Sequence, residues 1–366
     1  MFGNWSARLA RNIMNYTDDY RCEVWYAIKD LAKKIEFVKE GLHFKLFPAK
    51  TLHKAIESFF PIVSSPLLIE NLKREDSKNT IVHFQGERGS LLHGVLKNLP
   101  QFKITIQYHG YGQPSWLEWF EKIFITPHEI KNFRNASHFF VNIKPRLEYL
   151  EKQVHIPKNK ISYQNVGIDF NLFKPRNKTW ARRKLKLPLE SFILLHIGNL
   201  TSHKGVDKII RAYRILKKKY SHLFLLLVGS HPSHPLYKLA SQVADRLISK
   251  VPYKDLPLYY NAADVYCYYG NNKNIKYQGI GTAPTEALAS NLNEVSTNLI
   301  HFPDRIIDKI GFVPKNFADF VMKIEFLINK PYYHFNSRKK IDRYTSYKSQ
   351  TNQLLKVYAK LLRREN

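Results

Sequence analysis

Two glycines close to the start of an expected helix are the best-placed residues of this chain for binding a ligand. The stretch Y-Q-G-I-G-T-A-P-T-E-A-L-A-S-N, residues 277–291, places Gly279 and Gly281 one residue apart. Thr282 is a good N-cap and Pro284 fits a first helical turn, so a helix is expected to begin here. The free N–H groups and the positive dipole end of such a helix favour a phosphate group.

Glu286, about one turn into that helix, adds a second kind of chemistry. A carboxylate repels phosphate but accepts hydrogen bonds from sugar hydroxyls. An anion-binding loop beside a carboxylate therefore suits a ligand that carries both groups, a nucleotide sugar. A short Gly-x-Gly before a helix is a weak signal by itself, so the prediction depends on the elements around it.

The elements expected around this loop alternate between strands and helices. Residues 192–198 form an apolar run that ends at a glycine, which predicts a buried parallel strand. A polar loop, residues 199–204, leads to a helix that begins at 205–213, and further strands are expected at 223–228 and from 262 onward. This alternation predicts a doubly wound α/β sheet, which binds ligands at the carboxyl ends of its strands.

Four motifs, in this order and spacing, resemble the donor half of GT-B retaining glycosyltransferases, glycosyltransferase family 4. They are I-G-N-L-T-S-H-K-G-V-D-K-I-I-R-A from Ile197, L-L-L-V-G from Leu225, Y-Y-N-A-A-D-V from Tyr259 and Q-G-I-G-T-A-P-T-E-A-L-A from Gln278. Residues 165–175 also resemble the family's domain-junction motif, so the resemblance covers residues 80–360 or so.

The resemblance implies an α/β protein with two Rossmann-like, doubly wound domains that face a central cleft. The expected parts are an acceptor-side domain over residues 1–175, a nucleotide-sugar donor domain over 176–345, and a C-terminal helix over 346–366 that crosses back to the first domain. The implied reaction moves a sugar from the donor to a glycan or lipid-linked acceptor, with retention of configuration.

Roles for individual residues follow from the same resemblance. Lys204 corresponds to the family lysine that holds the donor diphosphate and stabilises the departing nucleotide. His109 takes the place of a histidine that lines the cleft near the transferred sugar, and Glu286 that of a glutamate that holds the ribose hydroxyls. The remaining donor contacts are expected from the backbone amides of Gly279, Ile280 and Gly281, and from Ser249, Lys250 and Val251 around the base.

Two charged residues of the family pattern are replaced in this chain. The family arginine falls at Asn199, and the first glutamate of the family's Glu-x7-Glu motif falls at Gln278. Each replacement removes charge stabilisation that is worth a few kcal/mol in a dry site. We predict an active enzyme with His109, Lys204 and Gln278 as catalytic residues; a weak or inactive nucleotide-sugar-binding relative is the alternative.

The beginning of the chain departs from the family fold. Residues 7–13 predict a helix and residues 21–28 a strand, whereas family members have one more, central strand before this helix. Three alternatives follow: the chain starts late, another segment fills the gap, or the first domain is remodelled. Further along, a helix over 115–124 would place five bulky apolar side chains on one face, for packing on the core or, alternatively, for gripping a membrane or an acceptor.

The charge of the chain implies an anionic partner larger than one nucleotide. Lys and Arg number 58 against 30 Asp and Glu, a net charge of +28. An anionic membrane surface and nucleic acid both fit this excess, with nucleic acid as an alternative acceptor; a basic proteome background is the third explanation.

Location and cofactors are predicted from what the sequence lacks. No apolar run reaches the about 18 residues that span a bilayer, no signal peptide opens the chain, and Cys22 and Cys267 lie in strand-like contexts as packing residues. We therefore expect a cytoplasmic protein, peripheral at the inner membrane face. No Asp-x-Asp occurs, so we expect no metal and no cofactor besides the donor, whose base and sugar stay open, as does the oligomeric state.

Overall fold

The computed structural model describes residues 5–51, 63–86, 90–108, 126–165, 167–270 and 281–362 of the chain. The chain divides into two compact units. Unit 1 consists of Met1–Gln164 and Lys348–Asn366, and unit 2 is Asn165–Tyr347. Each unit has its own sheets and its own hydrophobic cores, and each is described separately below.

Unit 2 contains a five-stranded sheet in the order β11-β10-β9-β12-β13, in which every neighbouring pair is parallel. The strands are β9 (Phe192–Ile197), β10 (Leu223–Val228), β11 (Arg246–Ile248), β12 (Val265–Tyr268) and β13 (Asn293–Ser296). The strand order reverses between β9 and β12, because β10 and β11 lie on one side of β9 while β12 and β13 lie on the other. Doubly wound sheets bind their ligands at such a reversal.

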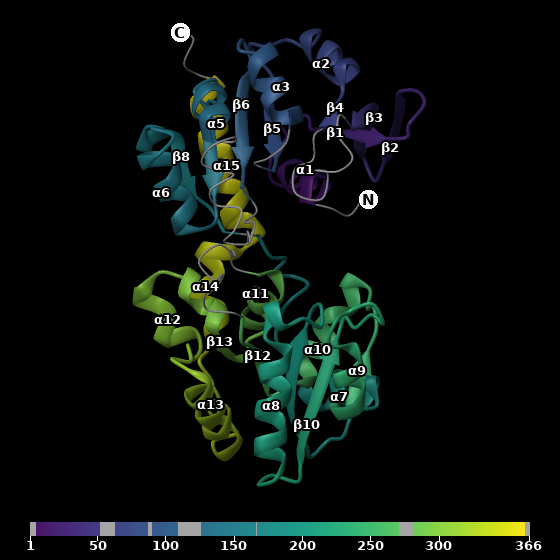
Figure 1. The fold of residues 1–366 in the computed structure, drawn as a ribbon, viewed down its shortest axis with the longest axis vertical. Coiled ribbons are helices and arrows are strands. Elements are labelled where there is room, and N and C mark those ends of the chain that lie inside the picture. The colour runs from purple at the N-terminus through teal and green to yellow at the C-terminus, as the bar shows by residue number, and fades with distance from the viewer. Residues whose placement is uncertain are drawn as a thin grey trace. The chain divides into compact units, whose positions relative to one another are not determined.

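Helices cover both faces of this sheet (Figure 1). They are α7 (Lys178–Leu185), α8 (Val206–Lys217), α9 (Tyr237–Val243), α10 (Leu256–Ala262), α11 (Thr282–Ala289), α12 (Asp304–Ile310), α13 (Phe317–Asn329) and α14 (Ser337–Thr345), with short 3-10 turns η4 (Ser202–Lys204), η5 (Tyr253–Asp255) and η7 (Thr297–His301). All six residues of β9 are buried. Ile193 and Leu195 belong to the core formed with α10, α11, α12 and α14, whereas Leu194 belongs to the core formed with α8 and α13. Burial on both faces explains the unbroken apolar run, and β9 and β10 confirm the two strands predicted there.

Unit 1 contains two separate sheets. The strands β5 (Ile81–Gln85), β6 (Lys103–Gln107), β7 (His138–Val141) and β8 (Ile161–Tyr163) form a parallel sheet in chain order. The strands β1 (Glu23–Lys29), β2 (Ile35–Lys39), β3 (Leu42–Thr51) and β4 (Val63–Ser64) form a mixed sheet around β3. The helices are α1 (Trp5–Tyr16), α2 (Pro66–Lys73), α3 (Ser90–Asn98), α5 (Thr126–Phe133), α6 (Lys144–Lys152) and α15 (Tyr347–Leu362), with a short 3-10 turn η3 (Lys158–Lys160).

The mixed sheet shows how the beginning of the chain is arranged. In the described residues no strand precedes α1, and β1 pairs with β3 rather than with the parallel sheet. Phe47 of β3 and Trp25 of β1 pack on the core beneath the parallel sheet. The strand expected over residues 21–28 is therefore present as β1, in a sheet separate from the parallel one.

The last helix, α15, completes a small core of unit 1. Leu354 and Tyr358 pack against Ile13 and Phe140. Polar contacts add to this packing, because the Gln353 side chain donates a hydrogen bond of 3.0 Å to the carbonyl oxygen of Tyr163. The N-terminal helix, a central strand and the C-terminal helix are therefore parts of one core.

Candidate functional site

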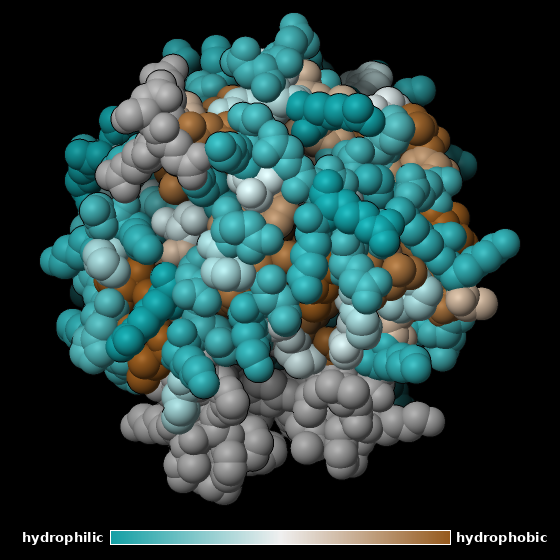
Figure 2. Space-filling model, turned by 90° about the horizontal axis from the view of Figure 1, so that it is seen from above, coloured by the Kyte–Doolittle hydropathy of each residue, from teal (hydrophilic) through white to brown (hydrophobic). Residues whose placement is uncertain are grey.

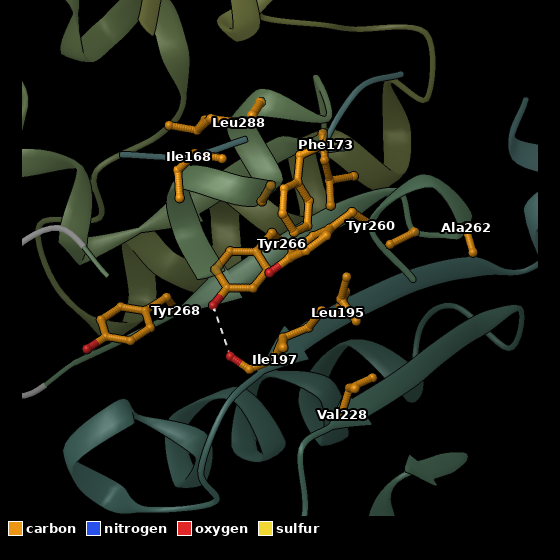
Figure 3. Close-up of a cluster of buried hydrophobic side chains, with 14 of the residues drawn as sticks. Ile168, Phe173, Leu195, Ile197, Val228, Tyr260, Ala262, Tyr266, Tyr268 and Leu288 are labelled. Atoms are coloured by element: carbon orange, nitrogen blue, oxygen red, sulfur yellow. Dashed lines mark hydrogen bonds between the residues drawn. The ribbon is translucent and has the colours of Figure 1, made fainter. Parts of the chain in front are cut away.

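The backbone ladder between β9 and β12 ends early. Only Leu194 and Leu195 of β9 have partners in β12, although β12 continues to Tyr268. Beyond these pairs the two strands are joined by the imidazole of His196, whose Nδ1 lies 3.0 Å from the carbonyl oxygen of Cys267. Tyr266 donates a hydrogen bond of 3.4 Å from its hydroxyl to the carbonyl oxygen of Ile197, as Figure 3 shows. Side chains therefore join the two strands where the strand order reverses.

The loop that follows β9 is held from both sides. The backbone N–H of Leu200 donates to Nδ1 of His234 across 3.2 Å, and the carbonyl oxygen of Leu200 accepts from the N–H of Leu236 across 3.2 Å. The hydroxyl of Thr201 accepts a hydrogen bond from the N–H of Lys204. Lys204 therefore projects from a backbone whose position is fixed by the loop after β10.

Gly205 brings this loop against β12. Its φ is +73°, and a Cβ at this position would overlap the carbonyl oxygen of Tyr269. Only glycine allows both this backbone conformation and this close approach. The corner formed by Lys204 and Gly205 therefore lies directly on the end of β12.

Lys204 is a half-buried cation that lacks an anionic partner among the described residues. Its Nζ lies 5.7 Å from the centroid of the Tyr268 ring, and no carboxylate of the described chain forms an ion pair with it. Burial lowers the pKa of its ammonium below the ordinary lysine value. A bound anion would compensate this desolvation, so the position favours a phosphate group.

Glu286 lies on α11 with 2% of its surface exposed. Its Oε2 accepts a hydrogen bond of 2.8 Å from the hydroxyl of Tyr260 on α10. In Figure 3 the ring of Tyr260 lies beside that of Tyr266, with 6.2 Å between the ring centroids. Since Tyr260 is itself fully buried, the carboxylate is held in one orientation.

The N-terminal end of α11 is anchored by η7. Gly281 is the N-cap residue, and its N–H donates to Oδ1 of Asn298 across 3.2 Å. The N–H of Gly270 donates to the hydroxyl of Thr297 across 3.0 Å. The N–H of Gly281, which the sequence assigned to the donor, thus already has a protein partner in this structure.

The other predicted site residues occupy the same carboxyl edge of the sheet where they are described. Asn199 is exposed in the loop after β9, and Ser249, Lys250 and Val251 follow the end of β11. His109, Gln278, Gly279 and Ile280 lie outside the described residues, as does the predicted aromatic helix over 115–124. The structure therefore brings Lys204, Asn199 and the residues after β11 to one edge, with Glu286 on α11.

Three residues of this region were missed by the sequence reasoning. His196 was hidden inside an apolar run, although a single imidazole in a wholly buried strand is a signal that could have drawn attention. Tyr260 and Asn298 gave no comparable signal, because their contacts join segments 26 and 17 residues apart.

A second buried carboxyl group, Glu294 of β13, faces the same core. It lies opposite Tyr266 in the β12–β13 ladder. Neither carboxyl oxygen has a hydrogen-bond partner within the described residues. Burial raises the pKa of Glu294 well above its ordinary value, opposed only in part by the nearby hydroxyl of Ser296. Burial therefore favours the protonated, uncharged form of this carboxyl group.

Neither a metal cluster nor a membrane-spanning helix is found in the described ranges. No three His, Cys, Asp or Glu side chains gather there in a way that could hold a metal ion. No described helix combines the length and the apolar character needed to cross a bilayer. Cys22 and Cys267 are both free thiols, and Cys267 is buried.

This chain is similar to known proteins. The family model of glycosyl transferases group 1 matches residues 177–348. The D-inositol 3-phosphate glycosyltransferase of Thermobispora bispora is 27% identical over 293 residues, which cover 67% of this chain and 66% of that protein, just under two thirds of its length.

Two solved structures show the same fold. Sucrose-phosphate synthase from Thermosynechococcus elongatus superimposes with a TM-score of 0.70 at 17% identity, over 97% of this chain and 92% of that one. Anabaena Alr3699/HepE in complex with UDP-glucose superimposes with a TM-score of 0.62 at 13% identity, over 87% of this chain and 86% of that one. The predicted GT-B fold is thereby confirmed.

Proposed function

Because the family model of glycosyl transferases group 1 matches residues 177–348 and the fold is GT-B, we propose that the protein transfers a sugar from a nucleotide-sugar donor to a glycan or lipid-linked acceptor, with retention of configuration. The observation that carries this proposal is the half-buried ammonium of Lys204, without an anionic partner among the described residues, at the strand-order reversal. The relative that binds UDP-glucose makes UDP-sugars the first donors to test.

Different described residues are proposed to contact different parts of the donor. Lys204 holds the diphosphate as a point charge, and Glu286, oriented by Tyr260, accepts hydrogen bonds from the ribose hydroxyls. Asn199 offers an amide donor beside the diphosphate, and the segment 249–251 lines the base. His109, Gln278, Gly279 and Ile280 complete the site by their resemblance to the family.

The reaction requires charge stabilisation on the leaving group. The bond between the anomeric carbon and the diphosphate oxygen breaks, and the acceptor hydroxyl attacks from the same face of the sugar. The proton of that hydroxyl passes to the departing phosphate oxygen, so atoms and charges balance. The negative charge that develops on the diphosphate lies next to Lys204, where a preorganised cation in a buried site is most effective.

Donor hydrolysis tests this proposal. The purified protein is incubated with UDP-, GDP- and ADP-sugars, with and without EDTA, and release of the nucleoside diphosphate is measured. We expect release from one class of donor, and we propose that it survives the chelator. Complete loss with EDTA and recovery with manganese would contradict the metal-free reaction. Tight binding without any release would favour the alternative of a non-catalytic nucleotide-sugar-binding protein.

The net charge of +28 motivates the second part of the proposal, docking on anionic lipid that carries the acceptor. The face of the molecule seen in Figure 2 is mostly hydrophilic, with apolar side chains among the polar ones. Each basic side chain near such a membrane contributes about 1 kcal/mol. Vesicle flotation and a DNA gel shift are run side by side at physiological salt. Binding to DNA but not to anionic vesicles would favour a nucleic acid as the acceptor.

A further inference from the structure

The protonation state of His196 follows from its contacts. Nδ1 lies 3.0 Å from the carbonyl oxygen of Cys267, and a carbonyl oxygen can only accept a hydrogen bond. Nδ1 therefore carries the proton. Burial lowers the pKa of the imidazole to about 4, and the charge of Lys204 adds to this effect. At neutral pH His196 is uncharged, and its Nε2 is an acceptor only.

This acceptor is buried and unpaired. His196 is 1% exposed, and its Nε2 has no hydrogen-bond partner among the described residues. Buried polar atoms nearly always have a partner, so an unpaired one calls for an explanation. A Cβ on Gly198 would stand 3.5 Å from Nε2. Since Gly198 has no side chain, that side of the imidazole is left uncovered by this residue.

His196 and Lys204 flank the same aromatic ring. The imidazole and the Tyr268 ring are 6.3 Å apart between centroids and nearly parallel, and Nζ of Lys204 is 5.7 Å from that ring. A ligand whose anion reaches Lys204 therefore brings its adjacent atoms toward His196.

The chemistry of Nε2 restricts what those atoms are. A lone pair repels phosphate oxygens, so His196 does not assist Lys204 in holding the diphosphate. It complements a hydroxyl group. In a nucleotide sugar the anomeric carbon is bonded directly to a phosphate oxygen, and the hydroxyl on the next carbon of the sugar lies beside the anion.

We propose that Nε2 of His196 accepts a hydrogen bond from the sugar hydroxyl next to the anomeric carbon of the donor, beside the diphosphate held by Lys204. This inference rests on the proposed function, because it names a contact to the sugar of the same donor. It makes His196 a group that distinguishes the sugar-bearing donor from the free nucleotide.

Two substitutions test the roles of the two imidazole nitrogens separately. The amide nitrogen of His196→Asn takes the place of Nδ1 and keeps the bond to Cys267, but this variant has no acceptor at the Nε2 position. His196→Gln extends to the Nε2 position with an amide oxygen, and loses the Nδ1 contact. Thermal unfolding of both variants establishes that they are folded.

Calorimetry then compares UDP-glucose with UDP, or the corresponding pair for the donor that the unaltered protein hydrolyses. We expect His196→Asn to weaken binding of the nucleotide sugar about tenfold and to leave binding of the free nucleotide within about twofold. His196→Gln should retain most of the difference in affinity between the nucleotide sugar and the free nucleotide. Equal losses for both ligands, or no loss, would overturn the hydroxyl contact.

A second measurement needs no variant. The 2-deoxy nucleotide sugar should bind the unaltered protein about tenfold more weakly than the natural donor. If His196→Asn is folded, this difference should disappear in the variant, as expected for two groups that interact. Full affinity of the unaltered protein for the 2-deoxy donor refutes the contact. Failure of the unaltered protein to bind any nucleotide sugar refutes the proposed function itself, so the two failures are distinguishable.

Discussion

The hydroxyl of Tyr260 donates a hydrogen bond of 2.8 Å to Oε2 of Glu286, with both side chains buried. Burial raises the pKa of Tyr260 well above its ordinary value, and the neighbouring charge of Glu286 adds to the rise. Both effects favour the protonated phenol, which is the form that donates the hydrogen bond. One oxygen of the carboxylate is thus engaged by Tyr260, which fixes how Glu286 is presented.

Removing that hydroxyl should weaken donor binding. Tyr260→Phe keeps the ring in its core and deletes one hydrogen bond to a charged group, so we expect a loss of about 1.5 kcal/mol, or about tenfold in affinity. Calorimetry with the nucleoside diphosphate measures it. Tyr259→Phe, on the same helix, is the matched control and should leave affinity unchanged. Equal effects of both substitutions would argue against orientation of Glu286 by Tyr260.

Donor binding should decrease at alkaline pH earlier than for an ordinary lysine site. Burial lowers the pKa of Lys204, so its ammonium loses the proton, and the diphosphate loses its cation, below the usual lysine value of about 10.4. Affinity should be complete below the lowered pKa and decline as pH rises through it. A pH series of binding constants measures this decline. Lys204→Met should abolish the decline together with most of the affinity, whereas Lys208→Met, which removes an exposed ammonium beside Asp207, should preserve both.

Glu294 should make the protein less stable at neutral pH than at mildly acidic pH. Its pKa is raised in the folded state, so above about pH 4.3 the unfolded chain releases a proton that the folded protein retains. The stability contributed by the protonated group is complete below that pH. As the pH rises above this value, the free energy of unfolding falls by up to about 1.4 kcal/mol per pH unit, until the pH reaches the pKa of Glu294 in the folded protein.

Glu294→Gln removes this loss, so the variant should unfold at a higher temperature than the unaltered protein at pH 7, with the difference shrinking toward pH 4. Thermal unfolding at several pH values measures the effect. Glu190→Gln, in an exposed turn, is the control and should leave the unfolding temperature nearly unchanged. A Glu294→Gln variant that is less stable at pH 7 would contradict a neutral, unpaired carboxyl group.

Two glycines with the same backbone conformation should respond very differently to alanine. Gly205 has φ +73° with the Tyr269 carbonyl in the path of a Cβ, whereas Gly41 has φ +74° with open space around that position. We expect Gly41→Ala to cost about 1–2 kcal/mol, the cost of a left-handed conformation. Gly205→Ala should cost more than about 4 kcal/mol, because backbone must move. Chemical denaturation compares the two, and similar costs would contradict the close approach.

The fold of unit 2 could be predicted because its sequence signals are local. The strands β9 and β10 are continuous apolar runs that end at glycines, and burial on both faces explains why they lack alternation. The arrangement of unit 1 could not be predicted in the same way. The pairing of β1 with β3, rather than with β2 that follows it in the chain, is determined by contacts between non-consecutive segments and by packing of Trp25 and Phe47 on the neighbouring core.

The candidate site, too, could be predicted where its signals lie within one segment and not where they depend on contacts between segments. The resemblance of the motifs to a known family pointed to Lys204 and Glu286, and the structure places Lys204 at the strand-order reversal and Glu286 on the helix that packs on the same core. Spacing could not show that Tyr260 orients Glu286 or that Asn298 occupies the N–H of Gly281, because these partners come from other elements. Contacts between elements carry no periodic signal in one sequence.

The two stretches of unit 1 lie on either side of unit 2 in the chain. On the ribosome, residues 165–347 emerge before α15, so unit 2 can fold while Phe140 and Ile13 still lack Leu354 and Tyr358. N-terminal domains usually fold first during synthesis, but unit 1 can be completed only after unit 2 has been synthesised. Until α15 is synthesised, its binding surface in unit 1 is an exposed apolar surface that chaperones can recognise, and a premature stop codon before α15 leaves it exposed permanently.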